Sequence, residues 1–182
     1  MHISILSSSI RTGRKSHNIA LYFQHFLNEN RLATVEILDL ASYNFPLFES
    51  PLKYQPNPSR IALEFKSKIV ASDGIIIVTP EYNGSIPASL KNAIDLLYEE
   101  WQGKPIAFST ASSGDFGGLQ AITHLQFIFW KIGALCVSKN FPVSKVQEKF
   151  DEFGLPIDPQ EMDEFAQIFI DNFLKCVEVS QK

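Results

Sequence analysis

Hydroxyl and cationic side chains gather near the amino end, where residues 7 to 18 read SSSIRTGRKSHN. An apolar segment precedes this run, and an amphipathic pattern from residue 19 to residue 27 predicts that a helix follows it. The first turn of a helix offers unpaired backbone N–H groups and the positive end of a dipole, and arginine and lysine add charge. These groups together suit a phosphate monoester. The residues leave one alternative open, a solvated basic turn in which Ser16 caps the helix.

A second polar loop, residues 79 to 86, follows the apolar run from residue 75 to residue 78. That run is too short for a helix and is apolar on both faces, which predicts a central parallel strand. Pro87 then fits the first turn of a helix. Loops at the carboxyl ends of parallel strands bind ligands in open α/β sheets, and Pro80 and Gly84 can shape the backbone so that its amides face a planar ring. The alternative is an ordinary connection that binds nothing.

A third loop, ASSGDFGG at residues 111 to 118, connects an apolar strand with a helix. It is predicted to lie at the same edge of the sheet as the other two loops. Glycines there allow the main chain to approach a ligand closely, and the alternative is a flexible turn.

The rest of the chain supplies the elements that position these loops. Apolar patterns predict strands near residues 2–7, 34–38, 74–79, 105–110 and 134–138. They alternate with helices predicted near residues 17–29, 58–72, 87–100, 117–132 and 159–178. Five strand–helix units favour a parallel sheet. Residues 43 to 59 are irregular and aromatic, and they are expected to cover a ligand, to contact a partner subunit, or to pack on their own core.

Two of these loops resemble one known family. Residues 80 to 95, PEYNGSIPASLKNAID, resemble the signature of the NAD(P)H-dependent FMN reductases, which include azoreductases, quinone reductases and chromate reductases. The spacing of Ser9, Arg11, Ser16 and Asn18 resembles the FMN-phosphate loop of that family, although the family usually has glycine where Ser8 stands. The chain has neither a Walker pattern nor G-x-G-x-x-G.

The resemblance implies one FMN per subunit and a set of contacts to it. The phosphate would be bound by Ser9, Arg11, Ser16, His17 and Asn18. The flavin ring would lie along Pro80, Glu81, Tyr82, Asn83 and Gly84. The pyrimidine side would meet Ser112, Ser113 and Gly114, and less directly Gly117 and Gly118.

The resemblance also implies a fold and a reaction. The fold is a flavodoxin-like three-layer α/β sandwich, a five-stranded parallel sheet of order 2-1-3-4-5, in one domain spanning residues 1 to 182. NAD(P)H would pass hydride to the flavin, which then reduces a flavin, quinone, azo or similar small acceptor, with no catalytic side chain and no metal. The rivals are a flavodoxin-type electron carrier and a non-catalytic module. The carrier is disfavoured because Ile10 and Lys15 stand where its phosphate loop has hydroxyls.

Composition limits the partners. The formal charge of −4 disfavours nucleic acid and anionic membranes as partners, and 182 residues with 45% hydrophobic content suffice for one core. Cys136 and Cys176 are widely separated, as in a cytoplasmic protein with free thiols. No signal segment or membrane-length apolar run is present. The family and the apolar residues of 43–59 and 87–101 lead us to expect a homodimer or homotetramer.

Overall fold

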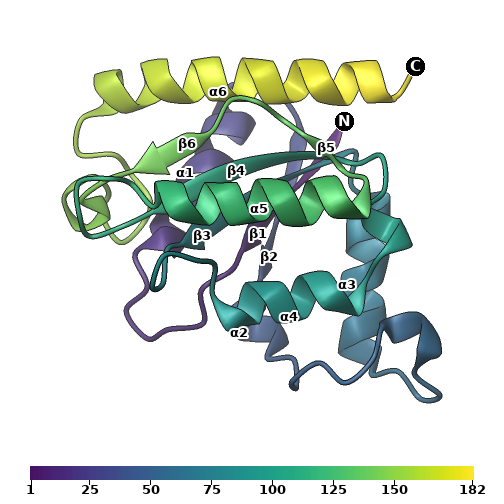
Figure 1. Cartoon of the computed structure of the whole chain (residues 1–182). Coiled ribbons are helices and arrows are strands. Elements are labelled where there is room, and N and C mark those ends of the chain that lie inside the picture. Colours follow the sequence, from purple (N-terminus) through teal and green to yellow (C-terminus); the bar gives the residue numbers. More distant parts are fainter.

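The computed structural model describes residues 1 to 182, in which strands and helices alternate (Figure 1). The strands are β1 (His2–Ser7), β2 (Thr34–Asp39), β3 (Gly74–Pro80), β4 (Pro105–Ala111), β5 (Leu135–Cys136) and β6 (Phe141–Val143). The helices are α1 (Ser16–Glu29), α2 (Leu40–Tyr43), α3 (Arg60–Ala71), α4 (Ala88–Leu96), α5 (Leu119–Ile132) and α6 (Pro159–Ser180). Three short 3₁₀ turns complete the set: η1 (Leu52–Tyr54), η2 (Glu99–Trp101) and η3 (Val146–Glu148).

All strand pairs in the sheet are parallel, and the order is β2-β1-β3-β4-β5, which confirms the predicted topology. Near the carboxyl edge, Ser7 of β1 is paired with Asp39 of β2 on one side and with Val78 of β3 on the other. Pro80 is paired with Ala111 at the end of β4. The register therefore brings the three polar loops to one edge of the sheet.

The fifth strand differs from the prediction of one segment over residues 134 to 138. Only Leu135–Cys136 pairs with the start of β4, and β6 then pairs with the end of β4, from Ser109 to Ala111. The polar residues 138 to 140 between them have low strand propensity, and Pro142 is tolerated in β6 because that strand lies at the edge. This break carries the following segment back toward the end of β4.

The helix predicted over residues 87 to 100 ends earlier, at Leu96. Trp101, in η2, turns inward and is completely buried against Phe129 of α5, with ring centroids 5.5 Å apart. Its indole N–H donates to the carbonyl of Ile94 at 3.1 Å. Burial of this side chain accounts for the chain leaving the helical path.

Two apolar cores lie on opposite faces of the sheet, because successive side chains of a strand point to opposite faces. On β3, Ile76 and Val78 pack into the core beneath α1 and α6, whereas Ile75 and Ile77 pack into the core formed with α3, α4 and α5. The strand is thus buried on both faces, as predicted for a central parallel strand.

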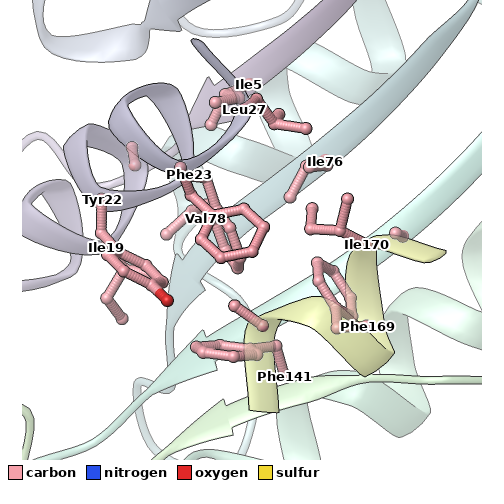
Figure 2. Packing of buried hydrophobic residues seen from close by; sticks show 14 of the residues in the cluster. Ile5, Ile19, Tyr22, Phe23, Leu27, Ile76, Val78, Phe141, Phe169 and Ile170 are labelled. Atoms are coloured by element: carbon pink, nitrogen blue, oxygen red, sulfur yellow. The ribbon is translucent and has the colours of Figure 1, made fainter. Parts of the chain in front are cut away.

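Aromatic rings fill much of the first core. Figure 2 shows Phe23 of α1 beside Phe141 of β6 and Phe169 of α6. The ring centroid of Phe23 lies 5.0 Å from that of Phe141 and 5.3 Å from that of Phe169. Helix α6 is placed by this packing. Its start was predicted correctly, since Oδ1 of Asp158 accepts a hydrogen bond from the N–H of Glu161 at 3.1 Å.

The segment from residue 43 to residue 59 packs in part on its own core. Tyr43 and Phe45 lie against Phe65 of α3, with centroid distances of 5.2 Å and 5.3 Å. Phe48 and Tyr54 remain exposed.

The α-helices of the chain include none that is both long and apolar enough to span a membrane.

Candidate functional site

A cavity of about 430 Å³ opens at the carboxyl edge of the sheet, where β1, β3 and β4 end. All three predicted loops contribute to its wall, together with the segment that follows β6. The lining residues are Ser9, Arg11, Gly13, Arg14, Lys15, Ser16, Pro80, Glu81, Tyr82, Ala111, Ser112, Ser113, Val146 and Gln147.

The start of α1 has several polar groups without hydrogen-bond partners. Ser16, the first residue of the helix, is buried, lines the cavity, and has a side-chain hydroxyl without a hydrogen-bond partner. The backbone N–H groups of Lys15, Ser16 and His17 donate to no carbonyl of the chain. Buried polar groups without partners are costly, and a phosphate at this helix end would satisfy them. The donors present therefore fit the phosphate of FMN.

The cations around this helix end have different roles. Arg14 is already engaged: Nη1 and Nη2 each donate to the carboxylate of Asp39 at 2.5 Å, and Nη1 also donates to the carbonyl of Ser9 at 2.5 Å. Arg11 and Lys15 line the cavity and make no ion pair within the chain. The positive charges of these two side chains are therefore available to bind a phosphate.

His17 and Asn18, two of the predicted phosphate ligands, do not line the cavity. Nδ1 of His17 is hydrogen-bonded to Oγ of Ser7 at 2.9 Å, and burial together with the nearby Arg14 charge lowers the pKa of this imidazole. Nδ2 of Asn18 donates to the carbonyl of Asp151 at 2.6 Å. The geometry gives both side chains other partners within the fold.

The first turn of the phosphate loop does not need glycine at position 8. Ser8 has no positive φ, so its backbone conformation is open to any residue. Its side-chain hydroxyl is buried without a partner, and its carbonyl accepts a hydrogen bond from Oγ of Ser89 at 2.8 Å. The departure from the family pattern thus leaves the turn intact.

The loop after β3 ends in a two-residue turn. Asn83 and Gly84 have φ values of 51° and 78°, and the backbones of Tyr82 and Ser85 exchange hydrogen bonds of 2.8 Å and 3.0 Å around them. Positive φ at both central positions is typical of the Asn-Gly turn. It leaves the N–H groups of both central residues without an internal partner.

The other predicted ring contacts are more restricted. Pro80 has no N–H, the N–H of Glu81 donates to the carbonyl of Ala111 at 3.1 Å, and that of Tyr82 is used by the turn. Of the five residues predicted to line the ring, only Asn83 and Gly84 have a free backbone donor, and these two lie in the same turn but outside the cavity lining. Pro80, Glu81 and Tyr82 line the cavity.

Two side-chain contacts fasten this loop to α5. Oε2 of Glu81 accepts a hydrogen bond from the N–H of Gln120 at 3.1 Å and so caps the helix, whose own N-cap is Gly118. Oγ of Ser85 lies 2.7 Å from Nδ1 of His124. Neither contact could be predicted from the sequence, because the partners are separated by 39 residues in the chain.

The third loop contributes Ser112 and Ser113 to the cavity, whereas Gly114 lies outside the lining. Gly117 and Gly118 have positive φ, and the absence of a side chain at each allows the chain to pack closely against its neighbours. A Cβ at Gly117 would lie 2.9 Å from Cβ of Pro142. These two glycines let α5 start close to the sheet, and they are not part of the cavity wall.

Sequence reasoning missed six lining residues: Gly13, Arg14, Lys15, Ala111, Val146 and Gln147. The first three belong to the basic run that was singled out, but their individual roles had no sequence signal. Val146 and Gln147 reach the site because β6 returns the chain to the end of β4, and the N–H of Val146 donates to the carbonyl of Ser112 at 3.1 Å.

Known proteins are similar to this chain in sequence and in fold. The family model for NADPH-dependent FMN reductases matches residues 1–148. The NAD(P)H-dependent FMN reductase LOT6 of Saccharomyces cerevisiae is 34% identical over 139 residues, which cover 69% of this chain and 72% of that protein. A quinone reductase of Escherichia coli K12 is 33% identical over 138 residues, covering 72% and 73%.

A solved structure agrees with these sequence matches. FerB, a flavoenzyme NAD(P)H:(acceptor) oxidoreductase of Paracoccus denitrificans, superposes with a TM-score of 0.80 at 25% identity and covers 98% of both chains. On these grounds the chain belongs to the NADPH-dependent FMN reductase family and is an FMN-dependent NAD(P)H oxidoreductase with a flavodoxin-like fold.

Proposed function

We propose that residues 1 to 182 act as one FMN-binding domain whose cavity holds the flavin while NAD(P)H reduces a small acceptor such as a quinone, an azo compound or a free flavin. The observation that carries this proposal is the buried hydroxyl of Ser16. It has no partner within the chain and lies at a helix start with three free N–H groups. A terminal phosphate supplies acceptors for all of these donors.

Phosphate binding is assigned to Ser9, Arg11, Lys15, Ser16 and the backbone of the α1 start. Arg11 and Lys15 offer charge that no carboxylate of the chain neutralises. The free N–H groups and the Ser16 hydroxyl lie together at one helix start, which suits a monoester at the end of a ligand better than a diphosphate within one. We therefore propose FMN and not FAD as the bound flavin.

Ring binding is assigned to the loop after β3, with the N–H groups of Asn83 and Gly84 as donors to the polar edge of the ring. The contacts of Glu81 and Ser85 with α5 hold this loop in place before a ligand arrives. Such preorganisation reduces the entropy lost on binding. Ser112 and Ser113 supply the opposite wall.

Bound FMN supplies the hydride-accepting and electron-donating chemistry, so the side chains need only bind it, orient it and leave one face accessible. The cavity holds no pair of titratable side chains in hydrogen-bond contact that would mark acid–base work: Glu81 is engaged in capping α5. The same accessible face would serve the nicotinamide and the acceptor in turn.

The exposed apolar surface supports a homodimer, or a tetramer built from it. A groove of about 680 Å³ lies between α4, α5 and residues 48 to 54, and its walls include Tyr54, Tyr98 and Phe127, all exposed. Burying such a patch in a two-fold contact is the commonest solution. We also place the protein in the cytoplasm, where NAD(P)H is available and free thiols such as Cys136 and Cys176 stay reduced.

An absorbance spectrum of the purified protein tests the proposal. The protein reconstituted with FMN should show a bound flavin spectrum, and NADPH or NADH added without oxygen should bleach it. Riboflavin is the matched control, because it carries the same ring without the phosphate and should bind more weakly. A protein that binds FMN and riboflavin equally, or that binds neither, would refute the assigned site.

A further inference from the structure

A carboxylate stands beside the anion site, where its charge opposes the phosphate. Asp39 ends β2 directly opposite Ser7, the last residue of β1. It forms its ion pair with Arg14, and the two side chains are only 19% and 17% exposed. A carboxylate near an anion site weakens phosphate binding by Coulomb repulsion, so the presence of Asp39 against the cavity-lining Arg14 requires a different explanation.

The hydrogen bonds of Asp39 supply an explanation for its presence. Its two oxygens accept from Nη1 and Nη2 of Arg14 at 2.5 Å, the bidentate geometry that fixes a guanidinium most firmly. Nη1 of the same guanidinium donates to the carbonyl of Ser9 at 2.5 Å. Oδ1 of Asp39 also accepts from the N–H of Ala41 at 3.0 Å, at the start of α2. One carboxylate thus links the end of β2 to the phosphate loop through Arg14.

We propose that Asp39 is a positioning residue for phosphate recognition, acting through Arg14 on the carbonyl of Ser9. By holding the guanidinium in place, Asp39 fixes the loop between Ser9 and Ser16 in the conformation that presents Arg11, the Ser16 hydroxyl and the free N–H groups. This inference rests on the proposed FMN site and adds a residue that does not itself line the cavity.

The charge state agrees with this role. Partial burial alone raises the pKa of Asp39, but hydrogen bonds from Arg14 and from the N–H of Ala41 outweigh it and hold that pKa below its ordinary value. The carboxylate is therefore ionised at neutral pH. The titratable groups that face it are Arg14 and His17, and the latter is hydrogen-bonded to Ser7.

Positioning and plain electrostatics predict opposite signs for Asp39→Asn. If charge alone mattered, removing the carboxylate would leave Arg14 unpaired beside the phosphate and tighten FMN binding. If Asp39 positions the loop, the same change weakens FMN binding. We expect a loss of at least about tenfold in FMN affinity, the lower end of the effect of losing one charge-assisted hydrogen bond, with riboflavin affinity unchanged.

The experiment is a fluorescence titration of FMN and riboflavin with the wild type, Asp39→Asn, Arg14→Gln and the double variant. Because Asp39 acts through Arg14, the double variant should bind FMN no more weakly than Arg14→Gln alone. Asp171→Asn is the matched control: this exposed aspartate of α6 has only Gln167 as partner, and its loss changes net charge equally. Its FMN affinity should equal that of the wild type.

Each result decides between the two accounts. Unchanged or tighter FMN binding by Asp39→Asn overturns the positioning role while the FMN site stands. So does an equal loss for riboflavin, which would show a general collapse of the site, or a further loss in the double variant. A wild type without FMN affinity overturns the proposed function and this inference together.

Discussion

The hydroxyl oxygen of Tyr82 lies 3.0 Å from Oγ of Ser9, so the loop after β3 and the loop after β1 are hydrogen-bonded to each other across the site. The guanidinium of Arg11 lies over the same tyrosine ring, 5.7 Å from its centroid. Residues separated by 73 positions in the chain therefore form one connected wall. The proposed phosphate and ring subsites share this contact.

That hydrogen bond should be measurable as a coupling. Ser9→Ala and Tyr82→Phe each remove one partner, and the double variant should lose less FMN affinity than the sum of the single losses. The expected coupling is about 0.5–1.5 kcal/mol, the ordinary value of a neutral hydrogen bond. Flavin titrations of the four proteins give it directly. Strictly additive losses would show that the two loops bind FMN independently.

Arg11→Ala should weaken FMN binding by about 1.5–3 kcal/mol, because a charge-assisted hydrogen bond to the phosphate is lost. Riboflavin binding should change little. Arg60→Ala is the matched control, since Arg60 is exposed at the start of α3 and makes no ion pair. Equal FMN affinity of Arg11→Ala and the wild type in a titration would remove Arg11 from the site.

Gly84→Val should abolish or strongly weaken flavin binding while the fold persists. Gly84 has a φ of 78°, which a β-branched residue resists at a cost of about 1–3 kcal/mol, and the turn that frees two N–H groups would be distorted. A Cβ there would also approach Oε1 of Gln120 to 2.6 Å, but that flexible side chain can move.

Gly103→Val is the control for this strain. Gly103 has a φ of 67° and nothing within 4 Å of its ideal Cβ, and it precedes β4, at the opposite edge of the sheet from the loop after β3. Both variants should lose similar thermal stability, whereas only Gly84→Val should lose its flavin. A Gly84→Val protein with a full flavin spectrum and reductase rate would make Gly84 a turn residue only.

The sequence predicted the cavity wall best where its residues lie in short, continuous segments. The loops after β1, β3 and β4 were recognised because each follows an apolar run, and parallel topology then requires them to meet at one edge. The strand order followed from the family resemblance. Asp158 and Pro159 marked the start of α6 because capping is determined by neighbouring residues.

What the sequence did not predict depends on contacts between distant residues. The division of the fifth strand reflects pairing along β4, and it brings Val146 and Gln147 to the cavity. The capping of α5 by Glu81 and the pairing of Arg14 with Asp39 each join separate loops. A single sequence shows the residue types but not these partners.

The ion pair of Asp39 predicts a pH dependence of stability. The pKa of Asp39 is lower in the folded state than its ordinary value of 3.8, so its contribution is fully present above that pH and is lost as the pH falls through the folded-state pKa. The difference in unfolding free energy between the wild type and Asp39→Asn should therefore be constant near neutral pH and shrink in more acidic solution. Urea unfolding at several pH values measures it. A difference that does not change with pH would exclude this linkage.

The last prediction concerns assembly through the groove between α4, α5 and residues 48 to 54. Light scattering should give a mass of two or four chains, and Phe127→Asp should reduce it, because Phe127 is 66% exposed and lines that groove. Phe153→Asp is the matched control, since Phe153 is 63% exposed and lies outside the groove. Burying a large aromatic side chain at an interface stabilises it by about 1.5–3 kcal/mol, so a charge there should separate the subunits. A wild type with the mass of one chain, full flavin occupancy and normal turnover would show that one subunit forms the whole site.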